Sequence, residues 1–268
     1  MQELITSIKQ VMSQKAVLPF SVYSSFQEQN LFNVPIIKPL LIFVLDGSKK
    51  LGKDNELNCP SGSFIFLSNS PTVDMRNIPH DKEYFALLIE FEYTDFDCFL
   101  RKPKKTQQYL QGEIDSILAN TLQQFVEWSA FAPATMWPIR RQEILQLIYQ
   151  LGYEQVSAII EPPSLSHKLH GIISADISAE LTADDLSSRL AMSPSTLRRK
   201  LSAEGINLQA IKDRVKLGYG LHLVQTSSEP IGVIAEKCGY YSQSRFTDRF
   251  KQLFGLTPTE LRKTRLRD

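Results

Sequence analysis

The chain has few of the features that mark secreted, metal-binding or membrane proteins. Its 268 residues include only three cysteines, Cys59, Cys98 and Cys238, an odd number without metal-ligand spacing, so we expect reduced thiols. No apolar run approaches the roughly 18 residues of a membrane span. The first ten residues lack the basic start and apolar core of a secretory signal. We therefore expect a cytoplasmic protein that does not contact a membrane.

Common enzyme motifs are also missing. The sequence contains no glycine-rich phosphate loop, no Gly-x-Ser-x-Gly and no Cys-x-x-Cys, so we expect no enzymatic activity and no cofactor. His80 stands alone without a His-x-His pattern. His167 and His170 are three apart, a spacing that fits surface or capping histidines better than a metal pair. We therefore predict no metal site.

The net charge of +1 is low for a nucleic-acid-binding protein, but the two parts of the chain differ. Residues 171–268 carry 15 Lys and Arg against 11 Asp and Glu, whereas residues 1–170 carry 15 against 18. The basic excess therefore lies in the last third, where it favours contact with a polyanion.

The first hundred residues predict β-strands. Apolar runs without a helical period occur at 40–45, 63–68 and 84–91, between clusters of Gly, Pro and Asn. Such short runs predict an all-β sandwich or small barrel. Apolar residues at helical spacing follow at 114–126 and again at 144–151, which predicts two helices after the strands.

Two domains are predicted around a proline-containing linker. Pro162 and Pro163 lie in the segment 161–166 and would stop any preceding helix. We expect an α+β protein with a β-sandwich or barrel and two helices in residues 1–160. Residues 166–268 are expected to form an all-α domain, opened by a helix around 169–174.

The last third repeats one helical pattern. Residues 181–201 and 231–250 each contain a short amphipathic helix, a tight turn and a second helix with a polar face that carries arginine. Thr182 and Asp185 resemble a capping box, and Ser193 and Ser242 are predicted N-caps of the two second helices. This layout predicts two helix-turn-helix motifs, each of which places its second helix in the DNA major groove.

We predict that both second helices contact DNA. Their apolar pairs, four residues apart, point into the domain core and leave the other faces free. The predicted DNA-contacting residues are Ser193, Ser195, Thr196, Arg198, Arg199, Ser242, Gln243, Ser244, Arg245, Thr247, Asp248 and Arg249.

The chemistry of these side chains leaves alternatives open. The arginines contact bases or phosphates, or they form a solvated basic face. Gln243 has the amide that pairs with adenine, and Asp248 can accept from cytosine N4 or serve as a partner of Arg245 or Arg249.

Residues 234–262 resemble the signature of the AraC/XylS family of bacterial transcription regulators, and the likeness extends over about 168–265. It is carried by a helix ending in Gly-Tyr, then Ser-x-Ser-x-Phe, Phe-Lys and Phe-Gly-x-Thr-Pro. Arg214, Val215 and Leu221 match the family's connecting helix, where Gly218 replaces a usual alanine. The resemblance implies a promoter-binding regulator that contacts RNA polymerase, and it favours activation.

Residues 39–50 and 60–66 resemble the family's cupin-like sensory domains, and the two following helices would take the place of its dimerisation helices. The resemblance therefore implies a homodimer. Three hypotheses remain for the N-terminal domain: a sensor of a small molecule, for which a fatty acid would suit a pocket lined by apolar residues with Lys or Arg; a module controlled by a partner protein or by self-association; and a cupin-type enzyme.

Gly218 and Gly220 lie inside the predicted connecting helix. Each helix-interior glycine costs about 1 kcal/mol relative to alanine. One hypothesis is that they let the two motifs reorient before DNA binds. The alternative is that Gly218 permits a close helix crossing.

Overall fold

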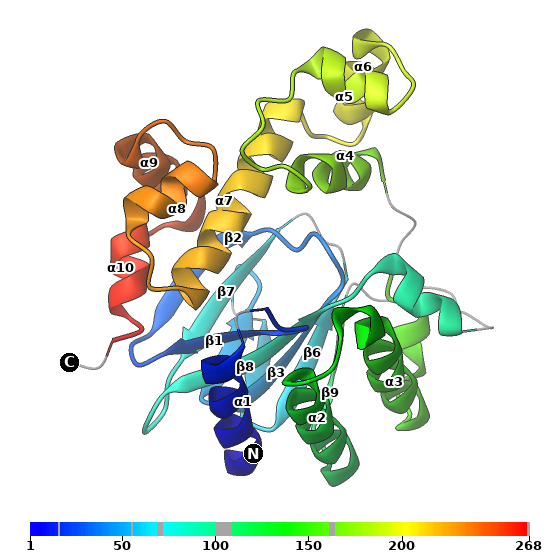
Figure 1. Ribbon diagram of the computed structural model, residues 1–268, viewed down its shortest axis with the longest axis vertical. Coiled ribbons are helices and arrows are strands. Elements are labelled where there is room, and N and C mark those ends of the chain that lie inside the picture. The colour runs from blue at the N-terminus through cyan, green and yellow to red at the C-terminus, as the bar shows by residue number, and fades with distance from the viewer. Residues whose placement is uncertain (16, 55, 69–71, 100–108, 161–163, 267–268) are drawn as a thin grey trace.

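The computed structural model describes residues 1–15, 17–54, 56–68, 72–99, 109–160 and 164–266. The prolines of the predicted linker, Pro162 and Pro163, lie outside these ranges. Figure 1 shows helices α1–α3 at one end of the molecule, the strands in the middle and the helices of the last third at the opposite end. None of the helices in the described ranges is long and apolar enough to cross a membrane.

The strands form two antiparallel sheets, which confirms the predicted sandwich. One sheet has the order β1-β8-β3-β6-β9 and the other the order β2-β7-β4-β5. The predicted runs at 40–45, 63–68 and 84–91 are β3, β6 and β8, each within one residue at either end. The strands are β1 (Ser21–Ser25), β2 (Gln29–Val34), β3 (Leu40–Asp46), β4 (Ser48–Leu51), β5 (Leu57–Pro60), β6 (Ser63–Leu67), β7 (Val73–Ile78), β8 (Tyr84–Glu90) and β9 (Tyr109–Glu113).

The helices follow the predicted order after the strands. In the described ranges, 3₁₀ helices also occur at Tyr93–Cys98, Ala134–Met136 and Glu154–Ala158. The α-helices are α1 (Gln2–Gln14), α2 (Ser116–Ser129), α3 (Trp137–Gln150), α4 (Leu165–Ser174), α5 (Ala183–Arg189), α6 (Pro194–Ala203), α7 (Leu208–Thr226), α8 (Ile231–Lys237), α9 (Gln243–Phe254) and α10 (Pro258–Lys263).

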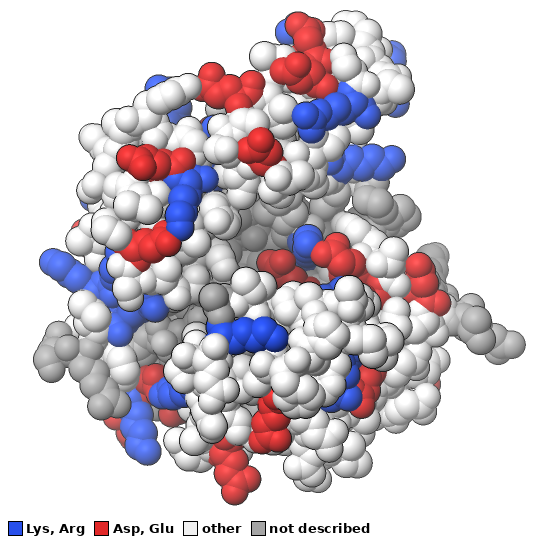
Figure 2. Space-filling view, in the orientation of Figure 1, with Lys and Arg blue, Asp and Glu red and all other residues white. Residues whose placement is uncertain are grey.

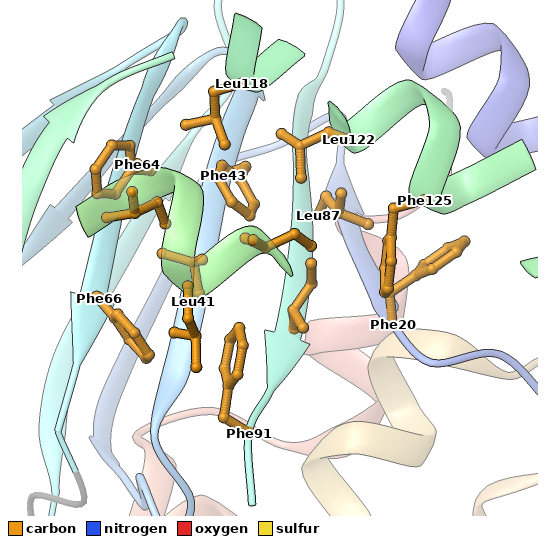
Figure 3. Close-up of a cluster of buried hydrophobic side chains, with 14 of the residues drawn as sticks. Phe20, Leu41, Phe43, Phe64, Phe66, Leu87, Phe91, Leu118, Leu122 and Phe125 are labelled. Carbon is orange, nitrogen blue, oxygen red and sulfur yellow. The ribbon is translucent and has the colours of Figure 1, made fainter. Parts of the chain in front are cut away.

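The first core lies between the outer face of the five-stranded sheet and helices α1–α3. Alternate residues of a strand point to opposite faces, so Leu41 and Phe43 of β3 face the helices while Ile42 and Val44 face the second sheet. Figure 3 shows Phe43, Leu118 and Leu122 in this cluster. Helices α1–α3 therefore cover the outer face of the five-stranded sheet.

The helix α1 corrects the prediction that the first hundred residues are all strands. Leu4, Ile5, Ile8 and Val11 are buried and follow helical spacing along its inner face. They pack in the same cluster as α2. The sequence contains this pattern, but the apolar runs that follow it hid the short helix.

A second core joins the sandwich to the last third of the chain. It contains the inner faces of both sheets together with Leu221 and Val224 of α7, Phe246, Phe250 and Phe254 of α9, and residues of α8 and α10. The second core is thus shared by the two predicted domains. By contrast, the residues of α4, α5, α6 and the start of α7 form a separate third core.

The two glycines of α7 lie at close contacts. A Cβ atom at Gly220 would lie 2.8 Å from the ring of Phe246 and 3.2 Å from the Cys238 sulfur. A Cβ atom at Gly218 would lie 3.0 Å from Cγ of Pro35. Packing therefore accounts for both glycines, although the helix crossing involves Gly220 and α9, and Gly218 instead meets the segment after β2.

We expect Gly220→Ala to lower the midpoint of thermal unfolding. Alanine would gain about 1 kcal/mol of helix propensity, but overpacking against the buried Phe246 ring costs about 1–3 kcal/mol. Gly171→Ala in α4 is the matched control, because nothing lies within 4 Å of a Cβ there, and this variant should be more stable than the natural chain. A Gly220→Ala protein that melts higher than the natural chain would contradict the packing role.

Candidate DNA-binding surface and interdomain cavity

Helices α5 and α6, the first motif, present a polar face at the surface. Thr182 and Asp185 form the predicted capping box at the start of α5. At the start of α6, Ser193 Oγ accepts a hydrogen bond of 3.2 Å from the Thr196 amide, which satisfies one of the free N–H groups of the helix terminus. Leu197 and Leu201 are buried in the third core. The remaining predicted contacts, Ser195, Arg198 and Arg199, are exposed on the other faces of α6.

Helices α8 and α9, the second motif, repeat this arrangement. Ser242 Oγ accepts a 3.3 Å hydrogen bond from the Arg245 amide at the start of α9. Phe246, Phe250 and Phe254 are completely buried on one face. The opposite face exposes Gln243, Ser244, Arg245, Asp248 and Arg249, while Thr247 is half-buried.

The sequence left open whether Asp248 pairs with a neighbouring arginine. Within the described part of the chain Asp248 has no ion pair, and Arg249 donates to Gln252 Oε1 at 3.2 Å. The carboxylate is therefore available to an external donor. The amide oxygen of Gln243 lies against Gly232 of α8, 3.1 Å from where a Cβ atom would stand.

The space-filling view shows that positive and negative side chains are interspersed over one face of the molecule (Figure 2). DNA contact on that face would depend on local groups of arginine and lysine rather than on one continuous basic surface. Exposed arginines on α6 and α9 supply two such groups.

A cavity of about 790 Å³ lies between the sandwich and helices α4 and α7. Its walls come from β1, the segment after β2, α4 and the middle of α7. Most of the lining is apolar, as at Phe20, Ile36, Met75, Leu88 and Leu221. The cavity is therefore lined by residues of both predicted domains and not by the sandwich alone.

Lys49 of β4 reaches this cavity from inside the sandwich. The side chain is 2% exposed, and its ammonium donates a 2.6 Å hydrogen bond to Asn77 Oδ1 and lies 5.6 Å from the centre of the Tyr84 ring. No carboxylate among the described residues pairs with it. Burial lowers the pKa of Lys49 to about 8, because desolvation disfavours the charged form.

The other charged groups of the cavity are already paired or lie at its surface. Lys38 forms a 2.5 Å ion pair with Glu92, and Arg141 bonds Asp95 at 2.6 Å. Among the described residues, the hydrogen-bond partner of the Lys49 ammonium is the neutral side-chain amide of Asn77. Lys49 is thus a cation in the cavity lining that has no ionic partner in the described ranges.

Two further polar atoms in the cavity wall have no hydrogen-bond partner among the described residues, Nε1 of Trp137 and Nε2 of His170. Burial lowers the pKa of His170 to about 4 and also lowers that of His222, so both rings are neutral at pH 7. Buried polar atoms usually find partners. Their presence here suits a ligand that carries a polar group.

The sequence did not single out Lys49 as a functional residue, although a signal was present. Lys49 and Leu51 are two apart in a strand and point to the same face, and Leu51 is fully buried. Among the described residues no group of three His, Cys, Asp or Glu side chains could hold a metal ion. Cys238 packs as a small buried residue, as expected.

Two capped helix-turn-helix motifs joined by one continuous helix define a DNA-binding protein. Residues 186–264 match the family profile described as "Helix-turn-helix domain". The chain is 30% identical over 122 residues to the urease operon transcriptional activator of Escherichia coli, covering 44% of this chain and 41% of that protein. It is 33% identical over 98 residues to the HTH-type transcriptional regulator GadX of Escherichia coli O6:H1, covering 37% and 36%.

The chain therefore carries a helix-turn-helix DNA-binding domain of the AraC type, which confirms the resemblance seen in residues 234–262. It spans less than half the length of these two curated relatives.

The whole fold is similar to that of ToxT from Vibrio cholerae. The apo structure of a ToxT point variant aligns with a TM-score of 0.69 at 16% identity and covers 94% of this chain and 99% of that chain. A wild-type ToxT structure with a bound unsaturated fatty acid aligns with a TM-score of 0.66 at 17% identity and covers 94% and 96%. At this identity the likeness shows the fold alone.

We expect Arg198→Ala and Arg245→Ala each to weaken binding to a promoter duplex. A bidentate arginine–guanine contact accounts for about 1–3 kcal/mol of discrimination, and its loss would relax the sequence preference at one base pair. Loss of a phosphate contact would instead weaken all sequences alike and lower the salt slope by about 1. Gel-shift titrations at several salt concentrations, with Lys263→Ala on α10 as the control, separate the two. Unchanged affinity in both folded variants would refute these assignments.

Proposed function

We propose that the chain regulates transcription in the bacterial cytoplasm by binding double-stranded promoter DNA through both motifs. The family profile and the regulators named above support this role. The two second helices would enter successive major-groove segments about 34 Å apart. Ser193 and Ser242 cap the N-termini of α6 and α9, and these termini would meet backbone phosphates. Contact with RNA polymerase would then make the protein an activator, as the name of the urease relative suggests.

A small amphiphilic anion in the interdomain cavity is the proposed effector. The observation that carries this proposal is Lys49, a buried cation without a carboxylate partner among the described residues, at one wall of a largely apolar cavity. A buried cation is stabilised by an opposite charge, and a fatty acid would supply both a carboxylate and an apolar chain. The fatty acid bound in one ToxT structure is consistent with this class of ligand.

The competing proposal is control by a partner protein or by self-association without a ligand. The second core packs the inner faces of both sheets. If a ligand could bind only between the sheets, this packing would favour control without a ligand. The cavity extends from the inner faces of the sheets to α4 and α7, and this unfilled space favours the ligand. Native mass spectrometry of the purified full-length protein, before and after lipid extraction, would distinguish them.

We expect Lys49→Met to abolish binding of dodecanoate. In the natural chain a ligand at a hundred times its dissociation constant should raise stability by about 2.7 kcal/mol, which thermal melting detects. Lys50→Gln on the same strand is the control, because adjacent residues point to opposite faces, and it should keep the response. Dodecanol, which has no charge, should stabilise the natural chain and the Lys49→Met variant weakly and equally. Dodecanoate binding that survives Lys49→Met would contradict the assignment of the anion to this lysine.

The same interaction predicts a pH dependence. The Lys49 ammonium is the main form at pH 7 and is lost as the pH rises through its pKa of about 8. A carboxylate titrates near pH 4–5, so it stays charged throughout this range. Dodecanoate affinity should be level between pH 6 and 7 and fall by up to about tenfold per unit above pH 8, as the ammonium deprotonates. Isothermal titration calorimetry checks this, and an affinity that stays level up to pH 10 would exclude an ammonium–carboxylate pair.

Self-association through α2 and α3 completes the proposal. Ile117 at the start of α2, Phe131 just after its end and Ile139 of α3 are 56%, 76% and 56% exposed, and exposed large apolar side chains suit an interface. The proposed homodimer would bury them. The proposed self-association surface lies within residues 104–160, of which 104–108 fall outside the described ranges.

We expect Phe131→Glu combined with Ile139→Glu to convert the full-length dimer to a monomer. A charge placed in an apolar interface loses hydration without gaining a partner. Val233→Glu, an exposed apolar position on α8, is the control and should leave the assembly unchanged. Sedimentation velocity at micromolar concentration gives the result. A natural chain that is already monomeric at these concentrations would overturn the proposal.

A further inference from the structure

A second cavity, of about 350 Å³, lies between the two motifs. Lys212 and Lys216 of α7 form its floor, and the segment before α5 lines one wall. The turn before α9 and the side chains of Arg245 and Arg249 line the other wall. Figure 1 shows α7 running from the first motif to the second. We call this cavity the intermotif cleft.

Positive charge predominates in the intermotif cleft. Four of its lining side chains are cations, Lys212, Lys216, Arg245 and Arg249, and no ion pair of any of them occurs among the described residues. Its two carboxylates already accept hydrogen bonds: Asp213 from Gln209 Nε2 at 2.9 Å and Glu180 from the Tyr241 hydroxyl at 2.8 Å. These donors are neutral, so both carboxylates stay charged, and four cations against two anions give the lining a formal charge of +2.

Both lysines keep donors free for an external anion. Lys212 donates to the carbonyl oxygen of Leu181, and Lys216 donates to that of Gly239 at 3.3 Å. An ammonium has three donors, so two remain on each side chain. The carbonyls hold the two ammonium groups at the walls of the cleft without neutralising them, because a carbonyl has no net charge.

The position of the cleft matches the DNA backbone. If α6 and α9 lie in successive major-groove segments, the minor groove and its phosphates pass between the two motifs. Arg245 and Arg249 belong to α9 and line the cleft, so the cleft borders the proposed DNA-contacting face. We propose that Lys212 and Lys216 bind a backbone phosphodiester there, a contact that rests on the proposed promoter binding and that neither second helix supplies.

The contact would serve more than affinity. A phosphate held between the motifs fixes where each second helix enters its own groove segment, because phosphate contacts set register while base contacts set sequence. Lys212 and Lys216 are four apart on one face of α7, so both can reach one phosphate group. They act here as positioning residues for the DNA-contacting helices.

The test compares Lys212→Gln/Lys216→Gln with Lys263→Gln, which removes one exposed charge on α10 away from the cleft. Each full-length protein is titrated at several salt concentrations with a 24-base-pair duplex that the natural chain selects from a random pool. The double variant should lower the slope of log affinity against log salt by about 1, and Lys263→Gln should not change it. The Lys212→Arg/Lys216→Arg variant, which keeps both charges, should have the same slope of log affinity against log salt as the natural chain.

A second arm locates the phosphate. Single methylphosphonates, which remove one backbone charge, are placed between the two half-sites. One of them should weaken the natural chain but not the double variant, which is the coupling expected for a direct contact. Equal weakening of both proteins at every position would overturn the proposal, as would an unchanged slope in a double variant that keeps its melting temperature.

The remaining outcomes are also decisive. If the random pool yields no preferred duplex, the proposed promoter binding fails first, which is distinct from failure of the cleft. If inorganic phosphate at constant ionic strength binds the DNA-free natural chain but not the double variant, while methylphosphonates have no effect, the cleft takes free phosphate and the backbone assignment is wrong. A lowered slope with a positioned methylphosphonate effect supports the backbone assignment.

Discussion

The hydrophobic core shared by the sandwich and the second motif is the constraint on which the rest of the structure depends. Phe246, Phe250 and Phe254 of α9 pack in the same cluster as residues of both sheets. A buried polar group reinforces this core: Gln29 Nε2 donates to Thr264 Oγ1 at 2.8 Å, and Gln225 Nε2 donates to Gln29 Oε1 at 3.0 Å. Since buried polar groups are costly unless they are bonded, these contacts favour one relative placement of the sandwich and the second motif.

The first motif is held differently. Its core is separate, and it joins the second motif through α7 and through surface bonds such as that between Tyr241 and Glu180. The 790 Å³ cavity lies under α4 and α7, next to this more loosely held part of the chain. A ligand there would touch the first motif's support on one side and the sandwich on the other. Under the proposed function, its occupancy would therefore act on the first motif, while the second stays fixed to the sandwich.

The sequence could predict what is set by local chemistry. Helix caps depend on residues three apart in the sequence, so the sequence alone predicted the caps Ser193 and Ser242 and the capping box at Thr182. The contact between Gln29 and Gln225 joins residues 196 apart and leaves no local signal. The shared core was missed for the same reason: an apolar residue on α9 looks the same whether it faces its own domain or a neighbouring one. The site residues on α6 and α9 follow from local periodicity, whereas Lys212 and Lys216 needed the second motif to be placed beside them.

The burial of Lys49 lowers the stability of the free protein. A cation transferred from water into the sandwich loses hydration, and the single neutral amide of Asn77 offsets only part of that loss. An apolar residue of similar size would fill the same space beside Tyr84 without that cost. The lowered pKa expresses the same penalty, since the buried side chain holds its proton less tightly than a lysine exposed to water does. A carboxylate in the cavity would reverse the balance by raising the pKa again. An anionic ligand would then offset the unfavourable free energy of the buried charge, whereas a neutral ligand would not, and this difference would make the cavity selective for anions.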